Sequence, residues 1–224
     1  MTKYLLRGFY GFLILLVASA FAFKVFQPIK VLPRIRLAPA FDMMDHNMIR
    51  LTSEDLRGQV VLYTFTYLNC ESPCYNIDQT MQEVQSRLGE TKIDQSKLTM
   101  ITISFDPQHD SPNALLNRAR ILNADANNWR FLTTTNEALL KTIIGTGFQT
   151  YYEKKEDGTF SFDPVFVLVD GWGVVRGEYR YQTEVSTADR ILRHISVLAD
   201  EVNNSTGPTK LAYEAAHLFL CYAP

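Results

Sequence analysis

Uncharged apolar runs alternate with amphipathic stretches through the middle of the chain, and this pattern predicts an α/β domain. The runs Val60–Tyr67, Leu98–Phe105 and Val165–Val169 are rich in β-branched and aromatic residues, as in strands that are buried on both faces. Apolar residues recur at helical spacing after Cys74 and again after Ser111, which can cap a helix. Strand, loop and helix therefore repeat, as they do in sheets whose parallel strands are joined by right-handed crossovers.

Hairpin signals at both ends of this region predict that the central sheet is mixed. A short hairpin is expected over Phe41–Leu51, and its turn residue His46 is expected to be exposed to solvent. After the strand that ends at Val169, the turn Asp170–Gly173 leads into a further strand and predicts a second hairpin. Thr187 then begins a helix with a continuous apolar face.

The amino terminus carries a membrane-directed segment. Lys3 and Arg7 precede an uncharged run from Gly8 to Phe23, which Lys24 closes. The motif at residues 18–20 resembles a signal-peptidase site, so the segment is either a retained anchor, which we favour, or a cleaved signal. Positive charge on its short amino-terminal side predicts a single-pass protein of the inner cell membrane, with the domain on the outer, periplasmic side.

The pattern divides the chain into four parts. We expect a membrane anchor or signal segment at 1–26, a proline-rich tether that holds the domain off the bilayer at 27–40, the folded domain at 41–203, and a carboxyl-terminal tail helix at 204–224. In the tail, His217 and Cys221 are four residues apart, which is a weak metal signal beside simple docking of the helix. The net charge of −2 gives no indication of a nucleic-acid partner.

Cys70 and Cys74 lie where the first buried strand gives way to a helix. Pro73 is suited to the first turn of that helix, because its missing N–H costs nothing there. A helix amino terminus stabilises negative charge and so favours thiolate, the form that attacks disulfides and binds soft metals. The spacing allows either a disulfide or joint coordination of one ion, and an inert disulfide staple is the alternative to a functional pair.

The order and spacing of these motifs resemble the Sco (SenC) family over about Phe41 to Val202. The matching pieces are Asp55-Leu56-Arg57-Gly58, the Cys70/Cys74 pair, Ile103-Ser104-Phe105-Asp106-Pro107, Asp110-Ser111-Pro112, and Leu168-Val169-Asp170 with Gly173. The resemblance implies a thioredoxin-like fold of the peroxiredoxin-like variant on a membrane anchor. It also implies a role in delivering copper to the binuclear copper centre of cytochrome c oxidase, which makes a respiratory oxidase or another membrane respiratory complex the expected partner.

One position departs from the family pattern. The family's copper site resembles two cysteines plus a histidine about eight residues before the aspartate at 170, and the count lands on Phe162. Pro164 instead precedes the strand, as does the proline that thioredoxin-like reductases hold opposite their cysteines. Two thiolates suffice for Cu(I), whereas Cu(II) favours a nitrogen donor. The replacement candidates are His109, His217 or Cys221 from this chain, or a ligand from a partner.

Three functions follow from these residues. The leading hypothesis is assembly or maintenance of a respiratory copper centre, with Cys70 as the attacking thiolate or Cu(I) ligand and Cys74 as the resolving thiol or second ligand. The second is a metal-independent thiol–disulfide reductase, in which Pro164 shapes the catalytic corner. The third is a structural subunit of a membrane respiratory complex that has kept the fold and lost the site.

Overall fold

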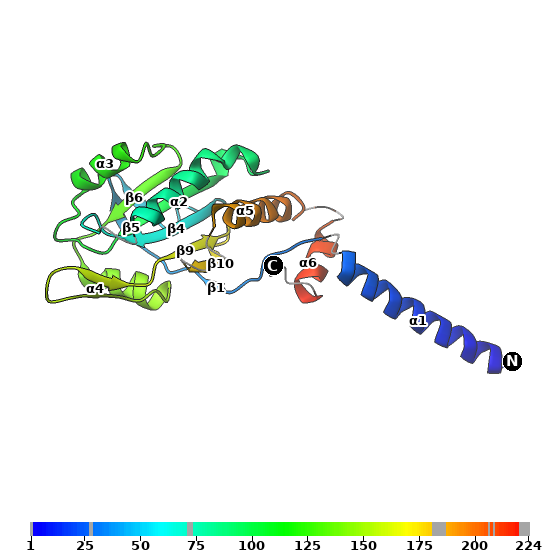
Figure 1. Ribbon diagram of the computed structural model, residues 1–224. Coiled ribbons are helices and arrows are strands. Elements are labelled where there is room, and N and C mark those ends of the chain that lie inside the picture. Colours follow the sequence, from blue (N-terminus) through cyan, green and yellow to red (C-terminus); the bar gives the residue numbers. More distant parts are fainter. Residues whose placement is uncertain are drawn as a thin grey trace.

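A mixed eight-stranded sheet forms the centre of the domain in the computed structural model, which describes residues 2–26, 29–70, 74–180, 187–205, 207 and 209–219 (Figure 1). The strand order is β1-β10-β9-β4-β5-β6-β2-β3. The strands are β1 (Arg36–Leu37), β2 (Asp42–Asp45), β3 (Arg50–Thr52), β4 (Val60–Thr66), β5 (Leu98–Ser104), β6 (Trp129–Thr133), β9 (Val165–Val169) and β10 (Val174–Arg180). β4, β5 and β6 run parallel, whereas β9 pairs with β4 antiparallel, so the predicted mixed sheet is confirmed.

Helices cover both faces of this sheet (Figure 1). One face is covered by α2 (Cys74–Ser86), α3 (Pro112–Ile121) and α5 (Ala188–Asn203), whose apolar residues join one core cluster. The other face is covered by α4 (Glu137–Leu140) and a π-helical turn, Lys141–Gly147. The hydroxyls of Ser111 and Thr187 cap α3 and α5, as the sequence predicts. Short 3-10 turns, Leu88–Glu90 and Gln95–Lys97, lie between α2 and β5.

The hairpin turn that contains His46 lies against β6 rather than in solvent. His46 is 4% exposed, and its ring meets the Phe131 ring edge-on at 5.7 Å. The backbone N–H of Phe131 donates to Nδ1 of His46 at 3.1 Å. The expectation of an exposed histidine was wrong because β2 pairs with the edge of β6 and carries the turn with it.

The amino-terminal helix α1 (Thr2–Phe26) contains one stretch, Tyr4–Ala22, that is long and apolar enough to cross a membrane. Its mean hydropathy is 1.9, and none of it is buried against the rest of the chain. These properties fit both a retained anchor and a signal sequence.

The segment after α1, where the sequence predicts a tether, packs onto the domain over its described residues. Val31 and Leu32 are fully buried, and β1 pairs antiparallel with β10. The backbone N–H of Ile35 donates to the carbonyl of Val175 at 2.9 Å. The segment is extended, as its prolines predict, but its apolar residues attach it to the domain instead of leaving it clear.

A buried arginine fixes this segment in place. Arg176 of β10 is 1% exposed and donates to the carbonyls of Leu32 at 2.6 Å and Pro33 at 3.0 Å. It also pairs with Asp170 at 2.9 Å and with Glu201 of α5 at 2.7 Å. All five donors of a guanidinium lie in one plane, so this side chain can hold several elements in one arrangement.

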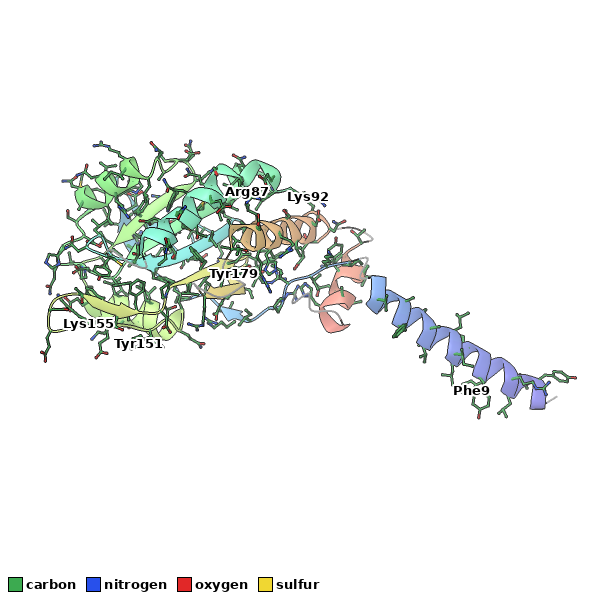
Figure 2. The ribbon with its side chains drawn as sticks, in the orientation of Figure 1. Phe9, Arg87, Lys92, Tyr151, Lys155 and Tyr179 are labelled. Atoms are coloured by element: carbon green, nitrogen blue, oxygen red, sulfur yellow. The ribbon has the colours of Figure 1, made fainter. Side chains whose placement is uncertain are left out.

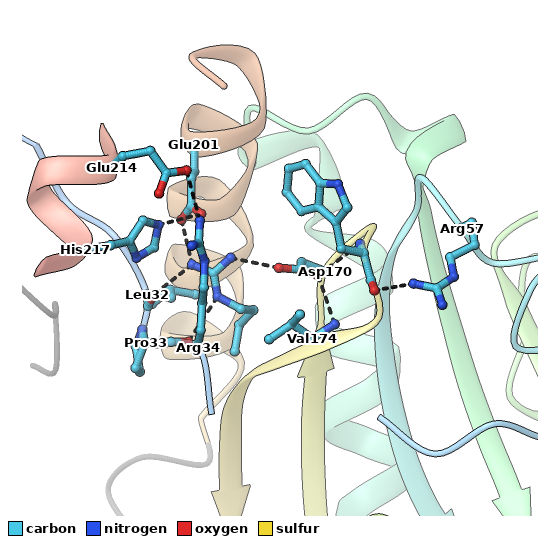
Figure 3. A network of polar contacts seen from close by, with 11 residues as sticks. Leu32, Pro33, Arg34, Arg57, Asp170, Val174, Glu201, Glu214 and His217 are labelled. Carbon is cyan, nitrogen blue, oxygen red and sulfur yellow. Dashed lines mark hydrogen bonds and ion pairs between the residues drawn. The ribbon is translucent and has the colours of Figure 1, made fainter. Parts of the chain in front are cut away.

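The tail helix α6 (Lys210–Phe219) docks onto the same network. His217 lies 2.9 Å from the second carboxylate oxygen of Glu201, and Glu214 pairs with Arg34 at 3.3 Å (Figure 3). Ala216 is 1% exposed, so the apolar face of α6 is packed at that point. The helix expected within 204–224 is therefore present over residues 210–219.

Candidate thiol and metal site

β4 carries Cys70 to the edge of the sheet. All seven residues of β4 are buried, and the strand ends at Thr66, four residues before Cys70. Cys70 is partly buried, packs against the core cluster that includes Tyr67, and is disulfide-bonded. Cys74 is the first residue of α2, as predicted, but its side chain and the whole of Cys221 lie outside the described part of the chain.

Pro164 lies at the same end of the sheet as Cys70. It is half-buried and immediately precedes β9, in which Phe166 is paired with Thr64 of β4. Continuing this antiparallel register by two residues places Pro164 opposite Thr66. The hydroxyl of Thr64 also donates to the carbonyl of Val165 at 3.1 Å, which fixes the start of β9 against β4.

The loop after β5 supports the segment that carries Cys70. Oδ2 of Asp110 accepts a hydrogen bond from the backbone N–H of Leu68 at 3.0 Å and another from the hydroxyl of Ser104. Asp110 is fully buried. Burial raises the pKa of its carboxyl group, and the hydrogen bonds from Ser104 and Leu68 oppose that shift.

His109 lies on this loop and is paired with a buried carboxylate. Its Nδ1 is 2.7 Å from Oδ2 of Asp106, and the side chain of His109 is 55% exposed while that of Asp106 is 2% exposed. A carboxylate that engages one ring nitrogen fixes the ring and leaves the other nitrogen as the potential metal ligand. Because β4 and β5 are parallel neighbours, the structure places His109 at the Cys70 end of the sheet.

His217 lies at the opposite end. Its partner Glu201 is bound to Arg176, and Arg176 also binds Asp170. Asp170 directly follows β9, at the end of β9 that pairs with the start of β4. The hypothesis that His217 folds back to the thiols was therefore wrong, because α6 packs at the far end of α5.

Aromatic rings occupy the place where the family resemblance puts a histidine. Phe162 belongs to a separate two-stranded hairpin formed by β7 (Tyr152–Lys154) and β8 (Phe160–Phe162). The Phe162 ring lies 5.1 Å from Phe105 and 6.2 Å from Tyr67, measured between centroids. Tyr67 and Phe105 follow β4 and β5, so this aromatic cluster lies beside the thiol corner.

The described residues include two of the predicted copper ligands, Cys70 and His109. Within the described residues, no group of three or more His, Cys, Asp or Glu side chains is arranged to hold a metal. Cys70 and His109 follow neighbouring parallel strands and so lie at the same end of the sheet. Thiolates are soft ligands that favour Cu(I), whereas Cu(II) needs additional harder donors.

The sequence alone indicates no role for Asp110 in positioning the segment that carries Cys70. The contact between Asp110 and Leu68 spans 42 positions in the chain. The only signal for it is the pair of acidic residues, Asp106 and Asp110, directly after a buried strand.

Comparisons with known proteins identify relatives of this chain. The sequence model of the SCO1/SenC family matches residues 31–199. A SCO1 protein homolog of Bacillus subtilis is 28% identical over 140 residues, which cover 62% of this chain and 71% of that protein. A protein of Stutzerimonas stutzeri, provisionally described as copper-binding, is 26% identical over 168 residues, covering 74% of this chain and 79% of its own.

A solved structure shows the same fold. BsSco, described as a member of the Sco family of cytochrome c oxidase assembly proteins that contains a disulfide switch, superimposes with a TM-score of 0.66. It is 25% identical, and the match covers 77% of this chain and 98% of BsSco. The thioredoxin-like α/β fold that the resemblance implied is thereby confirmed.

Proposed function

Because the chain belongs to the SCO1/SenC family, we propose that it assembles or maintains a respiratory copper centre through the thiols of Cys70 and Cys74. The observation that carries the proposal is the disulfide-bonded state of Cys70 at the corner between β4 and α2. We assign Cys74 as its partner. The description of BsSco as an oxidase assembly protein with a disulfide switch supports this assignment.

The pair alternates between two states in this proposal. A partner dithiol supplies the two electrons and two protons that convert the disulfide into two thiols, and is itself oxidised to a disulfide. The two thiols release their protons when they bind Cu(I) as cargo. The reduced pair also reduces a target disulfide. The Cys70 thiolate attacks one target sulfur and forms a mixed disulfide, and the Cys74 thiolate then attacks the Cys70 sulfur and displaces the target thiolate. The target gains two electrons and leaves as a dithiol, and the Cys70–Cys74 disulfide forms again.

Phe162 sets the metal preference. An apolar ring packed against Phe105 and Tyr67 supplies no ligand, so Cu(I) is the copper state that this site holds. His109 is the chain's own candidate for a third ligand, because it lies on the loop beside the thiols with one ring nitrogen engaged by Asp106. Pro164 shapes the backbone opposite the corner.

The location of the domain is part of the proposal. Lys3 and Arg7 precede the apolar stretch of α1, which favours an amino terminus in the cytoplasm and a domain on the outer side of the inner membrane. Disulfides persist in that compartment, so a Cys70–Cys74 disulfide would be stable there.

Metal-independent thiol–disulfide reduction is the second candidate function. The absence of a histidine at position 162 favours it, because the disulfide chemistry of Cys70 needs no metal. It predicts turnover against a model disulfide at a rate that does not depend on copper.

A titration separates the two functions. The reduced full chain in detergent is titrated with Cu(I) and with Cu(II) against competing chelators, together with Cys70→Ser, His109→Ala and, as a control, Cys221→Ser. We expect tight one-to-one binding of Cu(I), weak binding of Cu(II), loss in Cys70→Ser and no change in Cys221→Ser. Loss in His109→Ala would identify the third ligand.

The opposite result is equally clear. A folded, reduced chain that binds no Cu(I) but turns over a disulfide through Cys70 would establish the reductase. Indifference of oxidase copper content and of disulfide turnover to Cys70→Ser would leave only the structural-subunit hypothesis.

A further inference from the structure

A pocket of about 290 Å³ lies at the end of the domain opposite Cys70. The carboxyl-terminal end of α5, the segment before β5 and the turn between β9 and β10 form its walls. Its lining includes Val60, Ile93, Lys97, Gly171, Trp172 and Val202. Val60 and Leu98 are paired at the start of β4 and β5, so this pocket and the thiol corner lie at opposite ends of the same strands.

The chain itself brings this end of the domain to the membrane helix. Six Cα–Cα steps separate Phe26, the last residue of α1, from Leu32, and they span at most about 22 Å. Arg176 binds the carbonyl of Leu32 and the carboxylate of Asp170, which is adjacent in sequence to the pocket residue Gly171. Figure 2 accordingly shows Lys92 at the end of the domain towards α1 and Lys155 at the other end.

The exposed side chains at this end suit a bilayer surface. Trp172 is 55% exposed and Leu211 of α6 is 80% exposed. Tryptophan and lysine are the residues that typically settle at the boundary between lipid and water. Lys92 is held by Asp200 at 2.8 Å, whereas Lys97 forms no salt bridge within the described part of the chain. Lys97 interacts with the carboxylate of Asp94 only at longer range, so its exposed ammonium group can meet an anion.

We propose that this pocket binds a phospholipid of the bilayer that holds α1, with an acyl chain against Val60, Ile93 and Val202 and the phosphate at Lys97. The apolar walls match the acyl chain, and the lysine rim matches the phosphate. The proposal rests on the membrane anchoring within the proposed function and is independent of the cysteines. It orients the domain with the pocket towards the bilayer and Cys70 away from it.

The two tryptophans of the chain provide a direct test. Trp172 lines the pocket, whereas Trp129 is fully buried in the core. The full chain is incorporated into nanodiscs of phosphatidylcholine and phosphatidylglycerol whose acyl chains carry bromine, a short-range quencher. We expect the tryptophan fluorescence to be lower in brominated than in unbrominated nanodiscs, by the contribution of one tryptophan. The Trp172→Phe variant, which retains Trp129, should lose none.

Charge and filling variants test the pocket itself. Lys97→Gln should reduce the quenching in phosphatidylglycerol, and Lys97→Arg should preserve it. Val202→Phe, at a half-buried lining position, should fill the pocket and reduce the phospholipid that co-purifies with the chain, as measured by mass spectrometry.

Several results would overturn the proposal. Equal emission in brominated and unbrominated nanodiscs would do so, as would failure of the chain to incorporate, since the argument starts from α1. Quenching that survives both Lys97→Gln and Val202→Phe would place Trp172 at a lipid surface without a lipid-binding pocket. The emission of Cys70→Ser should be quenched as much as that of the unmodified chain. The lipid proposal and the copper proposal can therefore fail independently of each other.

Discussion

The backbone N–H of Leu68 donates a 3.0 Å hydrogen bond to Oδ2 of Asp110, which fixes the segment carrying Cys70 to the loop carrying His109. The two segments follow neighbouring parallel strands, so a single buried carboxylate sets the distance between them. The position of Cys70 thus depends on a residue that is remote in sequence and carries no metal-binding role of its own.

Asp110→Ala should destabilise the domain and loosen this corner. The change leaves the Leu68 N–H and the Ser104 hydroxyl without their buried acceptor, which costs about 1–3 kcal/mol for such a group. Urea unfolding of the full chain in detergent measures the loss, and the alkylation rate of Cys70 after reduction should rise. Asp110→Asn keeps an acceptor oxygen and serves as the control; an equal loss in both variants would refute the hydrogen-bond explanation.

Phe162→His should create the missing nitrogen ligand and raise Cu(II) affinity at least about tenfold, which corresponds to about 1.4 kcal/mol. The reason is that β8 places residue 162 in the aromatic cluster beside the thiol corner. Chelator competition measures the affinity. Phe160→His is the matched control, because Phe160 lies in the same cluster at 5.0 Å from Tyr67 and 5.1 Å from Phe105; an equal gain there would show that any histidine in the cluster reaches the metal and that position 162 has no special role. Equal affinity in Phe162→His and the unmodified chain would show that position 162 does not reach the metal.

Arg176→Met should cost about 3–5 kcal/mol of unfolding free energy, because it leaves Asp170 and Glu201 as buried carboxylates without their cation. The comparison is Arg50→Met, whose pair with Asp42 is exposed to solvent and should contribute little to stability. Urea unfolding measures both. Similar small losses in the two variants would mean that the buried network is not what holds the amino-terminal segment.

His194 should make the domain less stable as the pH falls below about 6.5. Burial, with smaller contributions from Arg190 and Arg193, lowers the pKa of His194 from 6.5 to about 4, and Nδ1 of its ring lies 2.7 Å from the Tyr179 hydroxyl. Between those pH values the unfolded chain binds a proton that the folded chain does not, so acidification favours unfolding by up to about 3 kcal/mol. Unfolding at pH 7 and pH 5 tests this. His194→Gln should flatten the dependence, and an unchanged slope would assign it to other groups.

The sequence was sufficient for the parts of the fold that depend on local periodicity. The buried strands β4, β5 and β9 are uncharged and β-branched, and the caps at Ser111 and Thr187 are short-range signals. The corner at Cys70 and Cys74 followed from the same pattern, because a strand end and a helix start are both local features.

Features that depend on contacts between distant segments could not be predicted. His46 is buried because β2 pairs with β6, a pairing between residues more than eighty positions apart. Val31 and Leu32 are buried because Arg176 of β10 holds that segment. His217 is bound by Glu201 for the same kind of reason. In none of these pairs does the local sequence pattern around one residue indicate its partner.

In the proposed membrane-anchored state, the attachment of residues 31–38 to the domain limits the distance from the bilayer at which Cys70 can meet a partner. Only residues 27–30 lie between the end of α1 and the fully buried Val31, so the linker between α1 and the domain is short. β4 extends roughly 20 Å from the pocket end to the Cys70 end. A short linker keeps the thiols within a thin layer at a nearly constant distance from the bilayer surface, which raises their local concentration in that layer. A partner would then need its reactive group at the same distance from the bilayer surface as Cys70, in addition to suitable chemistry.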